Sequence, residues 1–234
     1  MSTLSTRFRV LVLSDHVMFS EGMEMALTRQ GHDVRAGTLS RGAGRALPSP
    51  RAARFDAALV DVDADDESET LPVIAALSRA GTKVVVVTGS REHSRYGRYL
   101  HAGARTVLGK HVGLTELTGT FRRLSAGLAV QDADTRTHLL RAWTALEGEQ
   151  TEARRRLSTL TPREREVLGE LMRGRTVCEI AHSCVVSEAT VRTQVKSVLA
   201  KLEVSSQLAA VGMAYHLGWQ PPVVSPPTVL KPTA

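Results

Sequence analysis

Two acids, a hydroxyl and an amine stand far apart in the sequence, each at or just after the end of a short apolar run. They are Asp15, Asp61, Thr88 and Lys110. Transfer of a phosphoryl group to an aspartate requires a carboxylate nucleophile, oxygen ligands for Mg2+, and a hydroxyl and a cation that contact the phosphoryl oxygens. These residue types suit a phosphoryl-accepting site, provided that the fold brings the four side chains together.

Apolar runs and amphipathic segments alternate through the first half of the chain, and they predict the elements that would position these residues. We expect strands at residues 8–13, 32–36, 55–62, 82–90 and 104–110, and helices at residues 20–30, 71–81, 94–103 and 114–127. This alternation is typical of an α/β doubly wound, five-stranded parallel sheet covered on both faces. Because the carboxyl ends of parallel strands form one edge, the four residues should meet there. The segment 39–55 is rich in Gly, Pro and Arg, so a helix there should be short or distorted.

A second pattern, of four short helices, follows near the end of the chain. Thr161, Pro162 and Glu164 form a capping-box sequence that should start a helix over residues 160–174. Further helices are expected at 176–186, 189–202 and about 206–217, and Ser187 begins the third of them. A short helix, a tight turn and a longer helix with a polar exposed half are typical of a helix-turn-helix. On the pattern alone, the solvated face of an ordinary helical bundle is the alternative.

The residues of this second region also carry a family resemblance. It rests on LTPREREVL (160–168), Gly174, EIA (179–181), VSEATVRTQVKSVLAKL (186–202) and Ala209. Together they resemble the helix-turn-helix of the NarL/LuxR family of bacterial transcription regulators, and they fit it better than a sigma-factor region. The resemblance implies that Arg192, Thr193 and Lys196 reach DNA bases, while Ser187, Thr190 and Ser197 lie near phosphates.

Residues 8–127 resemble the receiver domain of two-component response regulators. The resemblance implies that Asp61 is the phosphoacceptor, that Thr88 and Lys110 contact the phosphoryl group, and that Asp15, Asp61 and the backbone of Asp63 hold Mg2+. This chain departs from the family pattern at three places. Ser14 replaces one acid of the metal site, Ala64 and Asp65 replace a Met-Pro turn, and Val107 replaces an aromatic switch residue. Loss of one carboxylate should weaken binding of Mg2+.

Two alternatives to phosphorylation remain open on these residues. In the first, Asp61 is only an acidic strand end and Asp65, Asp66, Glu67 and Glu69 form a solvated loop. Such a regulator would respond to a small ligand, to dimerisation or to its expression level. The second, more remote, is a magnesium-dependent hydrolase, but the chain lacks a second nucleophile or a convincing base for it. We therefore do not expect an enzyme.

Composition and charge indicate the kind of partner, the location and the domain limits of the protein. The net charge of +6 favours a polyanionic partner. The sequence has neither an apolar stretch of about 18 residues nor a secretory signal, so we expect a cytoplasmic protein that does not enter a membrane. We expect a receiver-like domain at 1–127, a partly helical linker at 128–156, a helix-turn-helix domain at 157–219 and a disordered Pro-rich tail at 220–234.

Together, these observations predict the function of the whole chain. We expect a DNA-binding transcription regulator of the response-regulator type, with phosphorylation at Asp61 as its control. Its expected partners are double-stranded promoter DNA, a second copy of itself, a histidine kinase and, under the alternative reading, a small-molecule ligand. A dimer would match paired half-sites in DNA.

Overall fold

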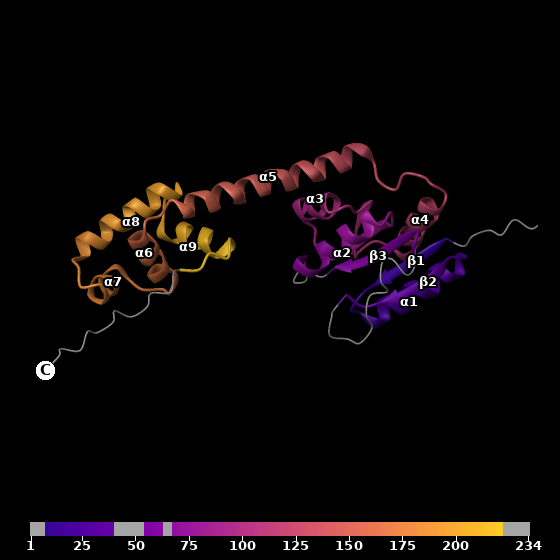
Figure 1. Cartoon of the computed structure of the whole chain (residues 1–234), viewed down its shortest axis with the longest axis horizontal. Helices are drawn as coiled ribbons and strands as arrows, with labels where there is room; N and C mark the ends of the chain where they lie inside the picture. Colours follow the sequence, from indigo (N-terminus) through magenta and orange to yellow (C-terminus); the bar gives the residue numbers. More distant parts are fainter. Residues whose placement is uncertain (1–7, 40–53, 63–66, 222–234) are drawn as a thin grey trace, which may run out of the picture. The chain divides into compact units, whose positions relative to one another are not determined.

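The computed structural model describes residues 8–39, 54–62 and 67–221, and the chain divides into two compact units between Leu146 and Glu147 (Figure 1). The expected helix within 39–55 falls almost entirely outside the described residues, as do Asp63 and most of the Pro-rich tail. In the described part of the chain, no helix combines the length and the apolar character that crossing a membrane requires.

The first unit contains the predicted five-stranded sheet. Its strands are β1 (Arg9–Leu13), β2 (Asp33–Gly37), β3 (Ala57–Val62), β4 (Lys83–Thr88) and β5 (Thr106–Gly109). All the strand pairs are parallel, and the strand order is β2-β1-β3-β4-β5. The helices are α1 (Val17–Arg29), α2 (Glu67–Arg79), α3 (His93–His101) and α4 (Leu114–Ser125). This arrangement confirms the doubly wound α/β fold.

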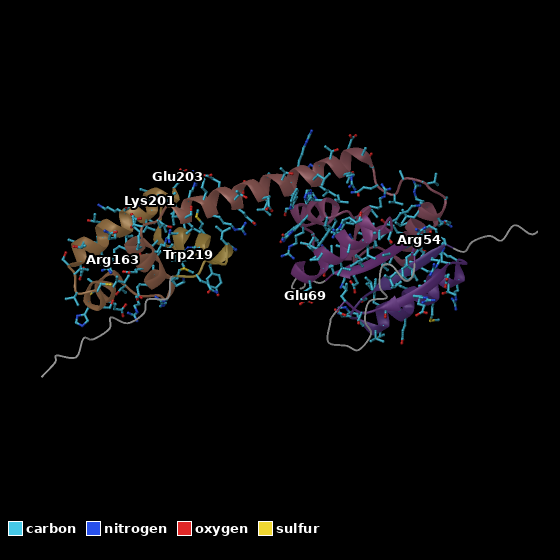
Figure 2. The ribbon with its side chains drawn as sticks, viewed as in Figure 1. Arg54, Glu69, Arg163, Lys201, Glu203 and Trp219 are labelled. Atoms are coloured by element: carbon cyan, nitrogen blue, oxygen red, sulfur yellow. The ribbon has the colours of Figure 1, made fainter. Side chains whose placement is uncertain are left out.

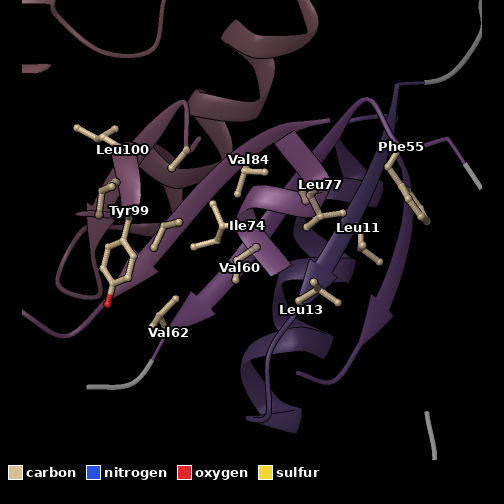
Figure 3. Packing of buried hydrophobic residues seen from close by; sticks show 14 of the residues in the cluster. Leu11, Leu13, Phe55, Val60, Val62, Ile74, Leu77, Val84, Tyr99 and Leu100 are labelled. Atoms are coloured by element: carbon tan, nitrogen blue, oxygen red, sulfur yellow. The ribbon is translucent and has the colours of Figure 1, made fainter. Parts of the chain in front are cut away.

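Two apolar cores cover the two faces of the sheet. On one face, Ile74 and Leu77 of α2 pack with Val60 and Val84, and Tyr99 of α3 joins the same core (Figure 3). On the other face, Leu27 of α1 and Phe121 of α4 pack with alternate residues of the same strands. The central strands are apolar along both faces because both faces are buried.

Helix α2 begins earlier than the sequence suggested. It starts at Glu67, so Glu67 and Glu69 belong to a helix, and the prediction that they form a loop was wrong. Carboxylates are favourable near a helix N-terminus because they face the positive end of the helix dipole. The acidic character of this stretch therefore favours the helix start as well as solvation.

Helix α5 (Ala133–Ser158) is a single helix of 26 residues, where the sequence indicated a linker with a helical stretch near residues 135–146. Its first half packs on α3, since Leu139 is buried in the sheet core and Trp143 stacks on His101 at 3.9 Å between ring centroids. Gly97 permits this contact, because a Cβ there would overlap the carbonyl oxygen of Leu139. The packing against α3 therefore stabilises a helix for which the sequence gives only a weak pattern.

The second unit contains the four predicted helices of the helix-turn-helix region. They are α6 (Pro162–Met172), α7 (Val177–Ser183), α8 (Glu188–Leu202) and α9 (Gln207–His216). Thr161 and Thr176 each form a capping box, with Glu164 and Glu179 respectively, and Ser187 caps α8. The turn between α7 and α8 passes through Val185 at a φ of 53°. These caps fix where each helix starts.

Candidate functional site

Asp61 lies at the centre of a cluster of polar groups at the carboxyl edge of the sheet. It is the next-to-last residue of β3, and its side chain is only 2% exposed. Ser14 donates a hydrogen bond of 2.7 Å from Oγ to Oδ2 of Asp61, and Nζ of Lys110 lies 2.9 Å from Oδ1. Both oxygens of the buried carboxylate therefore have a polar neighbour, as burial of a charge requires.

His16 is a member of this cluster that sequence reasoning did not single out. Its Nδ1 lies 3.4 Å from Oδ2 of Asp61, while its side chain is 57% exposed. The backbone N–H of His16 also donates to Oγ of Ser14 at 3.0 Å. The only signal in the sequence was its position directly after Ser14-Asp15 at the end of a strand.

Thr88 lies on the strand next to Asp61. It is the last residue of β4, it is buried, and it pairs with Val62, one residue beyond Asp61. Its Oγ1 accepts a hydrogen bond of 3.2 Å from the N–H of Ser90. Thr88, Asp61 and Lys110 thus come from three adjacent strand ends, as the sheet order requires.

Asp15 is held against the end of β2. Its Oδ1 accepts a hydrogen bond of 2.9 Å from the N–H of Leu39. Among the described residues, no group of three or more His, Cys, Asp or Glu side chains is placed to hold a metal ion. The oxygen chemistry of Asp15 and Asp61 nevertheless suits Mg2+, which proteins often bind through one or two carboxylates, with water and phosphate oxygens as the other ligands.

This arrangement can take part in phosphoryl chemistry at a carboxylate. Asp61 is a buried carboxylate, the type of group that accepts a phosphoryl group, and Lys110 is a cation that could contact an added phosphoryl group. The hydrogen bond from Ser14 covers one of the two oxygens of Asp61. Each oxygen of Asp61 keeps a second lone pair besides the one that faces Ser14 or Lys110, and such a lone pair is what an attack on phosphorus requires.

The second candidate surface is on α8. Val191, Val195, Val198 and Leu202 are buried against the other helices. Arg192, Thr193 and Lys196 are exposed, as the helical pattern predicted. Arg192 forms an ion pair of 2.8 Å with Glu188, while in the described part of the chain no carboxylate lies within 4.0 Å of Lys196. One amphipathic helix therefore presents two cations to the solvent.

The hydroxyl side chains of α8 divide between its first turn and its packed side. Ser187 and Thr190 are exposed, and their hydroxyl oxygens lie 2.9 Å apart. Ser197 instead donates a hydrogen bond of 2.5 Å to Oε1 of Glu164. The structure therefore brings Ser187 and Thr190 to the exposed start of α8 and directs the hydroxyl of Ser197 to another helix.

Glu164 joins α6 to α8 from a buried position. Lys201 of α8 (Figure 2) donates to its Oε2 at 2.7 Å, and the N–H of Thr161 donates to the same oxygen, also at 2.7 Å. Burial raises the pKa of Glu164, but the hydrogen bonds from Lys201, Ser197 and Thr161 outweigh burial and lower the pKa from 4.5 to about 2. The sequence indicated the capping box but not the link to α8.

Comparison with known proteins supports the identity of both units. The family model for bacterial regulatory proteins of the luxR family matches residues 158–214. A Pseudomonas aeruginosa protein named as a transcriptional regulator is 30% identical over 208 residues, which cover 88% of this chain and 96% of that protein.

Two further relatives extend over nearly the same region. The transcriptional regulatory protein NarL of Mycobacterium tuberculosis is 29% identical and is matched over 89% of this chain and 94% of its own length. The transcriptional regulatory protein YhcZ of Bacillus subtilis is 26% identical, with 89% of this chain and 97% of that protein covered. With its five-stranded parallel sheet and its luxR-family helix-turn-helix, the chain belongs to the NarL/LuxR-type response regulators, which are DNA-binding transcriptional regulators.

Proposed function

We propose that this regulator binds promoter DNA through α8 and that phosphorylation of Asp61 controls the binding. The observation that carries the proposal is the position of Asp61, a buried carboxylate that lies 2.9 Å from Lys110 at the edge where β4 ends with Thr88. This is the residue set that phosphoryl acceptance requires. A histidine kinase would supply the phosphoryl group.

The proposed DNA contacts are those of the exposed side of α8. The guanidinium of Arg192 can form two hydrogen bonds with guanine in the major groove, and Lys196 can contact bases or release counterions from phosphates. Ser187 and Thr190 lie in the first turn, where hydroxyls and backbone N–H groups suit a phosphate. Thr193 adds a methyl and a hydroxyl at the same face. Ser197 is assigned to helix packing, because its hydroxyl already bonds Glu164.

Mg2+ would be held by Asp15 and Asp61 in this proposal. When bound, the ion would offset the charge repulsion between the carboxylate and the incoming phosphoryl group. Ser14 stands where a third acid would strengthen the site. We therefore propose a weaker affinity for Mg2+ than a site with three carboxylates would have.

A regulator that is never phosphorylated is the second candidate. It is favoured by the hydrogen bond from Ser14, which occupies Oδ2 of Asp61 and leaves the carboxylate 2% exposed. In that case a small ligand or dimerisation would provide control. In either case we propose a homodimer on paired half-sites and a cytoplasmic location, where the chromosomal DNA is accessible.

The assignment of α8 is tested by single alanine substitutions. Arg192→Ala and Lys196→Ala should each weaken binding to an operator selected from random DNA by about tenfold or more, since each removes a base or phosphate contact. For Lys196→Ala, the slope of log affinity against log salt should also fall by about one. Fluorescence anisotropy over a salt series measures both quantities.

Arg154→Ala is the matched control, because it removes an exposed cation of the same unit outside α8. This variant should bind the operator as the wild type does. Unchanged affinity in both α8 variants, or an equal loss in Arg154→Ala, would contradict the assignment.

A further inference from the structure

A hollow with three cations lies at the amino edge of the sheet, the edge opposite Asp61. It consists of a cavity of about 400 Å³ and a second of about 300 Å³, which share three lining residues. These are Lys83, Arg105 and Arg136. We call this pair of hollows the cationic cavity. It lies entirely within the first unit.

The cationic cavity carries an excess of positive charge. Among the residues that the structure describes, no aspartate or glutamate lines either hollow. Nζ of Lys83 donates to the carbonyl of Leu124 at 3.0 Å, and Nη1 of Arg136 donates to the carbonyl of Ala104 at 3.2 Å. The guanidinium of Arg105 forms no hydrogen bond or ion pair with any residue that the structure describes. These hydrogen bonds hold Lys83 and Arg136 in place with carbonyl oxygens, which do not neutralise their positive charges.

The remaining lining adds a polar group and an apolar wall. Oε1 of Gln131 is a buried oxygen without a hydrogen-bond partner among the described residues. The same side-chain amide carries an N–H2 group, which can donate a hydrogen bond to an acceptor in the cavity. Leu124, Leu128 and Val130 form the apolar part of the lining. The volume is in the range of small-molecule sites.

The cationic cavity is separate from the proposed phosphorylation site. Lys83 begins β4 and Thr88 ends it, so the two edges are about 16 Å apart along this strand. Arg105 directly precedes β5, whereas Lys110 directly follows it. A ligand bound at the amino edge would therefore not contact Asp61 or block its phosphorylation.

We propose that the cationic cavity binds a small phosphate ester whose organic part lies against Leu124, Leu128 and Val130. A guanidinium can form paired, charge-assisted hydrogen bonds with phosphate oxygens, and the cavity offers two guanidiniums and one ammonium. A phosphate monoester carries nearly two negative charges at neutral pH and matches these three cations better than a single carboxylate does.

A bound phosphate would add to the contacts between two elements that α4 separates along the chain, since Arg136 already donates a hydrogen bond to the carbonyl of Ala104. Arg105 directly precedes β5, and Arg136 belongs to the first turn of α5. Their contacts with one phosphate would hold the start of α5 against the sheet. This inference is independent of phosphorylation at Asp61, and it supplies a ligand class for a regulator that responds to a small molecule.

Isothermal titration calorimetry of the full-length chain with phenyl phosphate tests the proposal. We expect one site per chain, weaker binding of benzoate, and weaker binding of inorganic phosphate because it lacks the apolar part. Arg105→Gln should weaken the binding of phenyl phosphate by about tenfold or more, since it removes a charge-assisted contact. The guanidinium of Arg105 forms no hydrogen bond or ion pair within the described residues, and the backbone N–H of Arg105, which donates to Val84, is kept in the variant, so this substitution should leave the fold intact.

Arg29→Gln is the matched control, because Arg29 is an exposed arginine of α1 outside the cavity. This variant should bind phenyl phosphate like the wild type. Amide NMR shifts on titration should be concentrated at residues 105 and 127–131. The proposed site would be overturned if phenyl phosphate did not bind, if Arg29→Gln lost as much affinity as Arg105→Gln, or if the NMR shifts were confined to α8. Tighter binding of benzoate than of phenyl phosphate would overturn the proposal that the ligand is a phosphate ester.

Discussion

Replacement of Asp61 by asparagine is expected to abolish the uptake of a phosphoryl group by this protein. In the wild type, incubation with acetyl phosphate and Mg2+ should add the mass of one phosphoryl group. The reason is chemical, since the amide of asparagine is not a nucleophile toward phosphorus and Asp61 is the carboxylate that Lys110 contacts. Intact-protein mass spectrometry, performed soon after mixing, measures the added mass.

Asp56→Asn is the matched control for this experiment. Asp56 also carries a carboxylate beside β3, but at its amino end, where Oδ2 accepts a hydrogen bond of 2.7 Å from the N–H of Arg9. This variant should take up one phosphoryl group, as the wild type does. The phosphorylation proposal fails if the wild type gains no mass or if Asp61→Asn gains the same mass.

Replacement of Glu164 by glutamine is expected to destabilise the DNA-binding unit by about 2 kcal/mol, because it removes the buried charge that accepts hydrogen bonds from Lys201 and Ser197. The variant should also change the dependence of stability on pH. In the wild type the pKa of Glu164 is lowered from 4.5 to about 2 on folding. A carboxylate with a lowered pKa stabilises the fold above its unfolded pKa, and this stabilisation is lost as pH falls toward the folded value.

The stability difference between wild type and Glu164→Gln should therefore be largest above about pH 5 and should shrink toward pH 2. Amide hydrogen exchange of α6 and α8 in the full-length chain measures it locally. Glu166→Gln is the control, because Glu166 lies on the same helix in a partly exposed pair with Arg163, and it should cost less than about 1 kcal/mol. If Glu164→Gln and Glu166→Gln lowered the stability of the unit equally, the hydrogen bonds from α8 to Glu164 would not be the source of the predicted loss.

The sheet could be predicted because its signals are local and repeated. Runs such as Val10 to Leu13 and Val84 to Val87 are apolar on both faces, and the five strands form the predicted parallel sheet. The helix starts at Thr161 and Ser187 were also predictable, since each cap is formed by residues three apart. Position at a strand end was enough to identify Asp61, Thr88 and Lys110 as neighbours.

The features that were missed depend on contacts between distant residues. The length of α5 rests on its packing against α3 at Gly97 and on pairs such as Glu152 with Arg156, which no apolar period indicates. Ser197 follows the helical pattern of a DNA contact, but Glu164, 33 positions earlier, accepts its hydrogen bond. The hydrogen bond from Ser14 to Asp61 spans 47 positions. A pattern read along the chain does not contain such pairings.

The central claim is that phosphorylation of Asp61 controls DNA binding, and the affinity for a selected operator with and without acetyl phosphate tests it most directly. For the wild type in the presence of Mg2+, phosphorylation should change the affinity measured by fluorescence anisotropy by about tenfold, a usual size for coupling between two sites. Asp61→Asn should bind the operator with one affinity under both conditions. An affinity of the wild type that does not respond to acetyl phosphate, or the same response in Asp61→Asn, would contradict the claim.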